Sequence, residues 1–185
     1  MRMVEEQSLQ FSIRSATMLD NALLAEVGAE TFSDTFAADN TLENIAAYLA
    51  EAFSPEKQAR ELADPASMFL IGEAEGLAVG YARLKIGEAP AAISGRRPME
   101  IARFYARKPW IGKGAGARLM QICLREAEHQ GCDVIWLDVW ERNYRAIGFY
   151  RKWGFVEVGI QGFQLGDDLQ RDLLMARVVT CGGPV

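Results

Sequence analysis

The sequence predicts an α/β fold in which helices flank both faces of a mixed central sheet of about seven strands. Segments of strand and helix character follow one another in the order β-α-α-β-β-β-α-β-α-β-β. Residues 134–140 (VIWLDVW) form a nearly continuous apolar run, which is typical of a strand buried on both faces. A glycine-rich turn at 111–116 joins a predicted strand to a predicted helix.

Each element is predicted by its own pattern. Residues 9–14 (LQFSIR) alternate as a strand does, and Leu19, Leu23, Leu24 and Val27 recur at helical spacing. Apolar runs separated by GEAEG indicate a hairpin. In chain order we expect a strand at 9–14, helices at 16–32 and 42–53, a helical stretch to Leu62, strands at 68–71, 77–84 and 99–106, a helix ending at Gly131, a strand at 134–140, a helix at 143–153, and strands at 155–165 and 172–179.

Composition narrows the class of protein. The chain has 185 residues, of which 50% are hydrophobic and 24% charged, and no linker divides it, so we expect one domain over residues 1–185. The net charge of −5 argues against nucleic-acid binding. No apolar run is long enough to span a membrane, and acidic residues near the start argue against a secretory signal. We therefore expect a cytoplasmic protein without nucleic-acid or membrane partners.

The cysteines and the histidine do not suggest a metal site. Cys123, Cys132 and Cys181 form no CxxC pair, and His129 is the only histidine. A Cys132–His129 pair remains an alternative to a packed cysteine and a solvated histidine. We expect no metal ligands.

The turn Ile111-Gly112-Lys113-Gly114-Ala115-Gly116 is a candidate pyrophosphate cradle. Its glycines let the backbone approach a ligand closely, and the free N–H groups at the start of the following helix attract phosphate. The spacing fits neither the G-x-G-x-x-G dinucleotide fingerprint nor a P-loop. A tight turn without a ligand remains the alternative.

Two motifs make the chain resemble the GNAT superfamily of acetyl-CoA-dependent N-acetyltransferases. The turn at 111–116 is similar to the family's [QR]-x-x-G-x-[GA] loop. Residues 143–155 (NYRAIGFYRKWGF) are similar to its N-x-x-A-x-x-F-Y-x-K-x-G-F helix. Ile111 departs from the loop because it stands where the family has Gln or Arg, and this implies weaker cofactor affinity. The resemblance implies the GNAT fold, with acetyl-CoA as cosubstrate.

Shorter pieces resemble a bacterial branch described as spermidine/spermine acetyltransferases. They are Glu30-Thr31-Phe32, Thr35-Phe36, Tyr48-Leu49, Ala52-Phe53, Trp136-Leu137, Val139-Trp140-Glu141 and Leu165-Gly166-Asp167-Asp168. The resemblance implies transfer of an acetyl group to a primary amine, with a polyamine such as spermidine or spermine as the small-molecule acceptor. A protein or peptide amino group is one alternative, and a non-catalytic CoA-binding regulator is another.

The resemblance also assigns the cofactor contacts and the acid. Tyr150 stands at the family's general-acid position, and its phenol keeps its proton at neutral pH. A packed core tyrosine is the alternative. Asn143 can cap its helix and bind the pantetheine arm. The expected cofactor-binding residues are Phe104, Tyr105, Ala106, Gly112, Lys113, Gly114, Ala115, Gly116, Ala117, Asn143, Tyr150 and Lys152.

The general base is left open among three acids. Glu100 lies on the strand before the glycine turn and is our first candidate. Asp138 and Glu141, at the end of the next strand, are further candidates. Solvated or ion-paired carboxylates without a catalytic role remain the alternative.

Acids and aromatic residues in the first two helices suggest where a polyamine binds. Acids around an aromatic wall suit a cation through ion pairs and cation–π contacts. An amphipathic surface is the alternative. The expected substrate residues are Glu30, Phe32, Asp34, Phe36 and Glu141. Separately, Trp110, Trp140 and Trp153 look exposed and favour a homodimer.

Overall fold

A computed structural model describes residues 10–180, so Leu9 and Cys181 of the sequence analysis lie outside it. Its seven strands form one sheet in the order β1-β2-β3-β4-β5-β7-β6. Neighbouring strands are antiparallel except β4 and β5, which are parallel. The strands are β1 (Phe11–Ser15), β2 (Ser67–Ala74), β3 (Leu77–Ile86), β4 (Pro98–Ala106), β5 (Val134–Trp140), β6 (Val156–Leu165) and β7 (Asp168–Val178).

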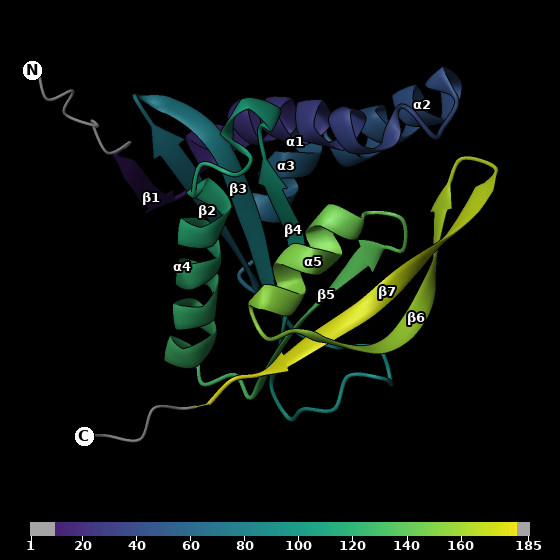
Figure 1. The fold of residues 1–185 in the computed structure, drawn as a ribbon. Coiled ribbons are helices and arrows are strands. Elements are labelled where there is room, and N and C mark those ends of the chain that lie inside the picture. Colours follow the sequence, from purple (N-terminus) through teal and green to yellow (C-terminus); the bar gives the residue numbers. More distant parts are fainter. Residues whose placement is uncertain (1–9, 181–185) are drawn as a thin grey trace, which may run out of the picture.

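Five α-helices accompany the sheet (Figure 1), which confirms the predicted α/β fold. They are α1 (Asn21–Phe36), α2 (Leu42–Ala52), α3 (Pro55–Leu62), α4 (Ala115–His129) and α5 (Tyr144–Lys152). Short 3-10 helices cover Met18–Asp20 and Lys108–Trp110. No helix among residues 10–180 is long and apolar enough to span a membrane.

The helices cover opposite faces of the sheet, as the alternation of side chains along β2 demonstrates. Leu70 belongs to the apolar cluster that contains Leu119 and Met120 of α4. Its neighbours Phe69 and Ile71 belong to a separate cluster with Leu24 and Val27 of α1. Successive side chains of a strand point to opposite faces, so α4 and α1 lie on opposite sides. Helix α5 shares the α4 face through Ile147 and Tyr150.

The first predicted helix has different bounds in the structure. It was expected at 16–32, but α1 runs from Asn21 to Phe36 after the 3-10 turn. Thr17 and Asp20 form a capping box around that turn, and Arg14 forms an ion pair with Asp20 at 2.8 Å. These contacts delay the start of the helix. Its four additional C-terminal residues decide which side chains reach the site described below.

The sheet opens between β4 and β5. Within the described residues, the ladder that joins them covers only Pro98–Glu100 and Val134–Trp136. Beyond it the two strands diverge, as Figure 1 shows. On its other edge β4 stays paired with β3 as far as Ala106, with a bulge at Ala102. The result is a split in the sheet with one side lined by β4 backbone.

The β6–β7 hairpin lies beneath α2 (Figure 1) and is tied to the α1–α2 region. Asn44 Nδ2 donates to Asp167 Oδ1 at 2.7 Å. Gln170 Nε2 donates to Asn40 Oδ1, also at 2.7 Å. These bonds join the hairpin to Asn40, in the segment between α1 and α2, and to Asn44, in the first turn of α2.

The tryptophans are less exposed than expected. Trp140 is only 8% exposed, and its ring centroid lies 5.2 Å from that of Phe36. Trp110 and Trp153 are half-buried. The homodimer therefore stays a prediction, and Trp140 no longer supports it because its side chain is buried.

Candidate active site

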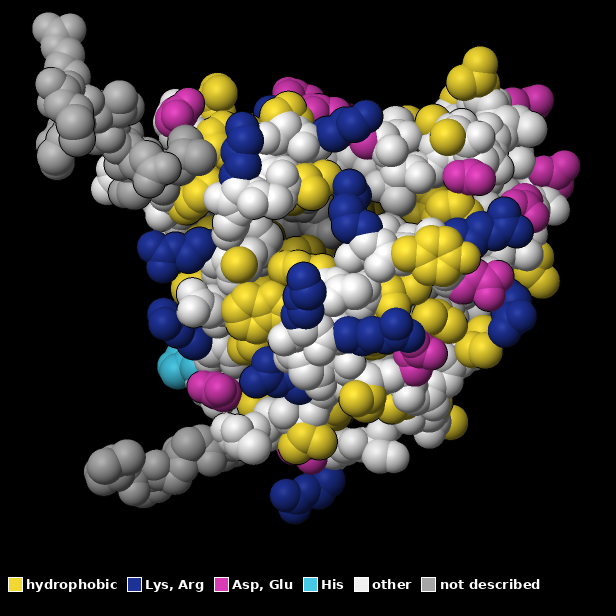
Figure 2. Space-filling view, viewed as in Figure 1, with side chains coloured by type: hydrophobic (Ala, Val, Ile, Leu, Met, Phe, Trp, Pro, Cys, Tyr) yellow, Lys and Arg dark blue, Asp and Glu magenta, His cyan; other side chains and the backbone are white. Residues whose placement is uncertain are grey.

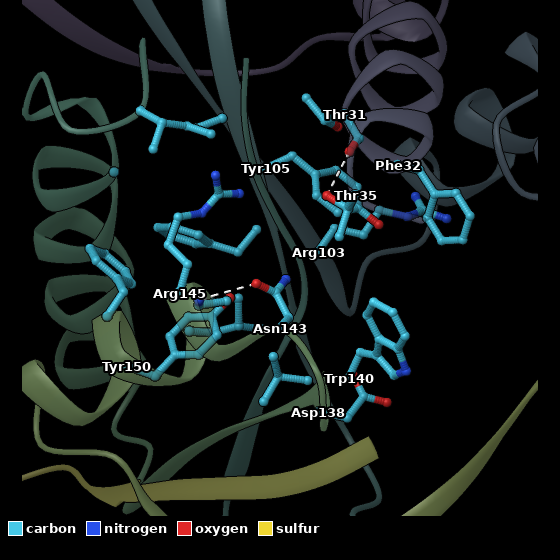
Figure 3. Close-up of a pocket in the computed structure, with 18 of the residues that line it drawn as sticks. Thr31, Phe32, Thr35, Arg103, Tyr105, Asp138, Trp140, Asn143, Arg145 and Tyr150 are labelled. Carbon is cyan, nitrogen blue, oxygen red and sulfur yellow. Dashed lines mark hydrogen bonds between the residues drawn. The ribbon is translucent and has the colours of Figure 1, made fainter. Parts of the chain in front are cut away.

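A cavity of about 560 Å³ lies where β4 and β5 diverge. Residues from both faces of the sheet line it, and Figure 3 shows many of them. We distinguish two ends. The α4/α5 end is lined by the glycine turn, the start of α4, and α5; the α1/α2 end is lined by α1, α2 and the side chains of β5, β6 and β7 that face them.

The open edge of β4 forms one wall of the cavity. All residues from Glu100 to Ala106 line it, including Phe104, Tyr105 and Ala106, which the sequence assigned to the cofactor. Beyond Glu100, which pairs with Trp136, this stretch has no ladder partner on the β5 side among residues 10–180. Backbone N–H and C=O groups on that edge are therefore available to an extended ligand.

The glycine turn has the backbone conformation that its sequence suggests. Gly112 has φ 79° and Gly114 has φ 95°, a region that favours glycine. Gly114 is the N-cap of α4, and no side chain caps the helix there. The first-turn N–H groups of α4 are therefore free to bind an anion. Figure 2 shows several Lys and Arg side chains around the hollow on this face.

The turn residues divide into two groups. Gly112, Gly114, Gly116 and Ala117 line the cavity. Lys113 and Ala115 do not: the Lys113 ammonium lies 5.2 Å from the Trp110 ring, and Ala115 is buried in an apolar cluster. The side chains of these two residues therefore lie outside the cavity in this structure, and with them the predicted charge of Lys113.

Helix α5 brings two predicted residues into the cavity. The Asn143 side chain accepts a hydrogen bond from the Ala146 N–H at 3.2 Å and so caps the helix (Figure 3). Tyr150 is 7% exposed and packs edge-on against Phe104 and Phe155. Burial, followed by the nearby Asp138, raises the pKa of its hydroxyl above the usual value.

Two basic residues near α5 differ from expectation. Lys152 does not line the cavity; it is exposed beside a separate hollow near Trp153 and Val156. Arg145, which the sequence analysis did not select, does line it, and Figure 3 shows its side chain extending from α5 into the α4/α5 end. Arg145 could have been identified from the sequence, because it lies in the first turn of α5, two residues after the predicted cofactor residue Asn143.

An aromatic wall lines the α1/α2 end. The Phe32 ring stacks on Phe36 at 4.3 Å and on Tyr48 at 4.4 Å. Trp140 contacts Phe36, and Phe163 lies edge-on to Tyr48 at 5.6 Å. The two predicted aromatic residues are thus in the cavity, joined by three more from α2, β5 and β6.

The three predicted substrate acids lie elsewhere, which corrects the sequence analysis. Glu30 and Asp34 are exposed, and Glu30 forms an ion pair with Arg107 at 3.0 Å. Glu141 pairs with Arg171 at 3.6 Å. For Glu30 and Asp34 the physical reason is helical geometry: Phe32 and Phe36 share a face of α1, while residues two positions away point to the opposite side. Glu141 follows the end of β5.

Three other acids line the cavity instead: Glu100, Asp138 and Asp172. Burial raises the pKa of each carboxyl, and Asp138 adds to the shift of the other two. For Asp172 the pKa rises to about 7. The sequence analysis weighed Glu100 and Asp138 as bases but missed Asp172. The sequence does contain a pattern that could have identified it: Asp172 alternates with Leu174 and Ala176, so all three share one face of β7.

Arg103 of β4, a cation that lines the cavity, already has partners. Its guanidinium forms an ion pair with Glu61 of α3 and donates to Gln58 at 3.1 Å. It also lies 5.1 Å from the centroid of the Phe53 ring. Arg103 therefore fastens α3 to the sheet. Within residues 10–180 it forms no ion pair with Glu100, Asp138 or Asp172.

Comparisons with known proteins agree with this geometry. A family model described as Acetyltransferase (GNAT) family matches residues 30–155. An uncharacterized N-acetyltransferase from the pepI 3′ region of Lactobacillus delbrueckii subsp. lactis is 33% identical over 153 residues, covering 83% of this chain and 88% of the relative.

Two matches come from Thermoplasma acidophilum. Its spermidine N(1)-acetyltransferase is 26% identical over 151 residues, covering 80% of this chain and 89% of the relative. The crystal structure of its PaiA N-acetyltransferase in complex with coenzyme A superposes with a TM-score of 0.74 at 24% identity, covering 92% of this chain and 99% of the other. That similarity demonstrates the shared fold.

Proposed function

This chain belongs to the GNAT family of acetyl-CoA-dependent N-acetyltransferases, and from that premise we propose that its acceptor is a small primary amine, with spermidine and spermine as the first candidates. A distant relative named for spermidine acetylation supports the choice of candidates. Membership of an acetyltransferase family argues against the CoA-binding regulator that the sequence left open.

The observation that carries the proposal is the composition of the α1/α2 end. Carboxylates and aromatic faces line it together, and both attract cations. An alkyl amine with a pKa near 10.4 is neutral only about one time in 2,500 at pH 7, so it arrives as an ammonium ion. A cavity end of this composition suits such a molecule.

The α4/α5 end fits a phosphorylated, extended cosubstrate. A Cβ built on Gly112 meets no atom within 4 Å, so the turn is open to a ligand. The uncapped N–H groups of α4 and the Arg145 guanidinium suit phosphate, and the free edge of β4 suits an amide-containing arm. Acetyl-CoA supplies the acetyl group as an activated thioester. We assign the β4 backbone at Phe104–Ala106 to its pantetheine arm and to the oxyanion.

Proton transfer needs a base and an acid. Three acids line the cavity, and of these we assign Glu100 as the base, with Tyr150 as the acid. Glu100 faces the α1/α2 side, since it pairs with Trp136, and its raised pKa makes it a stronger base for an ammonium proton. Tyr150 lines the α4/α5 end, and its raised pKa keeps the proton on Oη at neutral pH. In the proposed mechanism Glu100 accepts the proton of the amine, and Tyr150 Oη donates one to the thiolate.

The β6–β7 hairpin favours a small acceptor over a peptide. Its hydrogen bonds to Asn40 and Asn44 hold it against the α1–α2 region, and Phe163 of β6 forms part of the aromatic wall. An extended peptide needs an open groove at this position. A flexible polyamine can thread into a narrower space.

The test is a thiol-release assay with acetyl-CoA across spermidine, spermine, 1,4-diaminobutane, lysine and peptides with free amino termini. We expect turnover on the polyamines at least about tenfold faster, as kcat/KM, than on peptides. Turnover confined to peptides would keep the acetyltransferase chemistry and refute the small-amine proposal.

A further inference from the structure

Among the cavity carboxylates, only Asp172 has a fully buried oxygen that lacks a hydrogen-bond partner within the described residues. The residue is 7% exposed and lines the α1/α2 end. Its Oδ1 is fully buried and makes no hydrogen bond to residues 10–180. A buried, unpaired carboxylate oxygen is costly to a folded protein and is seldom retained without a role.

The strand register places Asp138 beside Asp172. Asp172 pairs directly with Trp140 of β5, and Asp138 pairs with Leu174. The two acids are therefore diagonal neighbours on one face of the sheet, with their Cα atoms about 7–8 Å apart. Gln161 of β6, which pairs with Asp172, reaches across and donates its side-chain amide to Asp138. Asp138 thus has a protein partner, whereas Asp172 Oδ1 has none.

The groups around Asp172 leave its charge uncompensated. Asp138, and Glu141 beyond the end of β5, repel it, and Tyr48 of α2 faces both Asp172 and Asp138. The neighbouring Arg171 is exposed and paired with Glu141. The surroundings therefore favour the arrival of a cation from outside the protein.

We propose that Asp172, with Asp138 beside it, binds the second, non-reacting ammonium group of a dicationic acceptor and so makes the enzyme select diamines and polyamines over monoamines. The inference rests on the proposed small-amine function and adds to it a residue and a selection rule. The aromatic wall would contact the methylene chain between the two nitrogens, and the buried carboxylate would hold the far nitrogen.

The test compares two amines with the same carbon chain, 1,4-diaminobutane and n-butylamine. In the parent protein we expect kcat/KM to be higher for the diamine. Asp172→Asn should reduce kcat/KM for the diamine by about 10- to 100-fold, the range for losing a charged hydrogen bond. It should leave kcat/KM for butylamine within about twofold. Glu128→Gln, at an exposed acid of α4, is the matched control and should change neither.

A pH series separates charge recognition from a structural role. The Asp172 pKa of about 7 must fall when an ammonium binds, so below pH 7 binding requires loss of a proton. The ratio of kcat/KM for the diamine to that for butylamine should therefore rise between pH 6 and pH 8. In Asp172→Asn the ratio should stay flat. Asp172→Glu, which keeps the carboxylate, should retain the rising ratio.

Two results would overturn the proposal. One is a loss of kcat/KM in Asp172→Asn that is equal for both amines. The other is a ratio of kcat/KM, diamine to butylamine, that is the same in Asp172→Asn as in the parent protein at pH 8. Calorimetric titration of 1,4-diaminobutane into the parent and the variant provides a readout that needs no turnover. If neither amine is acetylated but the diamine binds the parent more tightly than Asp172→Asn, the small-amine function fails and the ammonium site stands. Equal binding would refute the site itself.

Discussion

The two ends of the cavity are built in different ways. The α4/α5 end consists mainly of backbone groups. They belong to the free edge of β4, two glycines with positive φ and the uncapped start of α4. At the α1/α2 end, side chains from α1, α2, β5, β6 and β7 converge. A backbone site depends on local conformation, whereas a side-chain site depends on how distant elements pack. A backbone site therefore tolerates many side-chain substitutions, whereas a single substitution in a side-chain site can change which ligand it binds.

This difference predicts that Tyr150→Phe affects turnover and spares binding at both ends. Removing the hydroxyl should lower kcat by about 10²- to 10⁴-fold, the usual contribution of an acid. Acetyl-CoA affinity should stay within about twofold, because the ring packing against Phe104 is preserved. Steady-state kinetics and calorimetry measure the two effects. An unchanged kcat would remove Tyr150 from the mechanism.

Glu61→Gln should lower the stability of the protein, because it removes the ion pair that ties α3 to Arg103 at the α1/α2 end. Arg103 and Glu61 have side chains 10% and 9% exposed, and Arg83 also contacts Glu61 at 2.9 Å. Removing the carboxylate leaves buried guanidinium charge unpaired, and we expect a loss of about 3–5 kcal/mol in the free energy of unfolding. Urea denaturation measures it. Glu157→Gln, in an exposed pair with Arg151, should cost less than about 1 kcal/mol.

Gly114→Val should weaken the α4/α5 end alone. Valine is strained by about 1–2 kcal/mol at the left-handed φ of this residue, and its side chain would project from a turn that lines the cavity. We expect acetyl-CoA affinity to fall by about tenfold or more, with Gly148→Ala in α5 as the control. If calorimetry finds full affinity, the backbone of this turn does not hold the phosphates.

Asp138→Asn should shift the pH dependence of the reaction. Burial raises the Glu100 pKa most, and the charge of Asp138 raises it further. Removing that like charge stabilises ionised Glu100 and lowers its pKa. The acid limb of kcat/KM for butylamine should therefore move to lower pH, by less than about one unit. A limb that stays in place would mean that Glu100 is not the base or that Asp138 does not influence it.

Glu30→Gln should have the smallest effect. Glu30 lies outside the cavity and pairs with Arg107 near the surface. We expect KM for amines to change by less than about twofold, since exposed ion pairs contribute only about 0–1 kcal/mol. A large rise in KM for polyamines would show that the acids of α1 reach the acceptor after all.

The same contrast explains what could be predicted from the sequence. The strands, most helices and the α4/α5 end follow from contiguous patterns: alternation, glycines, and the run from Asn143 to Phe155. Contacts of this kind lie close together along the chain. Lys113, Ala115 and Lys152 are the exceptions, since none of them lines the cavity. A helix presents neighbouring residues to different sides, and Lys152 lies beside the separate hollow near Trp153.

The α1/α2 end could be predicted only in part. Phe32 and Phe36 were selected, but Glu30 and Asp34 were grouped with them by closeness in sequence, although residues two positions apart on a helix point to opposite sides. Asp172 is brought to Asp138 by the pairing of β7 with β5, and the pairing partner of a strand cannot be read from its own residues. Long-range register, and not local propensity, decides which acids are buried together.

The open edge of β4 has a consequence for the stability of the whole protein. A ligand that lies along Ile101–Ala106 extends the sheet by one more hydrogen-bonded row at the position where β5 turns away. Folding and ligand supply are therefore linked, and the melting temperature should rise with the logarithm of acetyl-CoA concentration. Amide hydrogens on this edge should exchange slowly only when that row is in place.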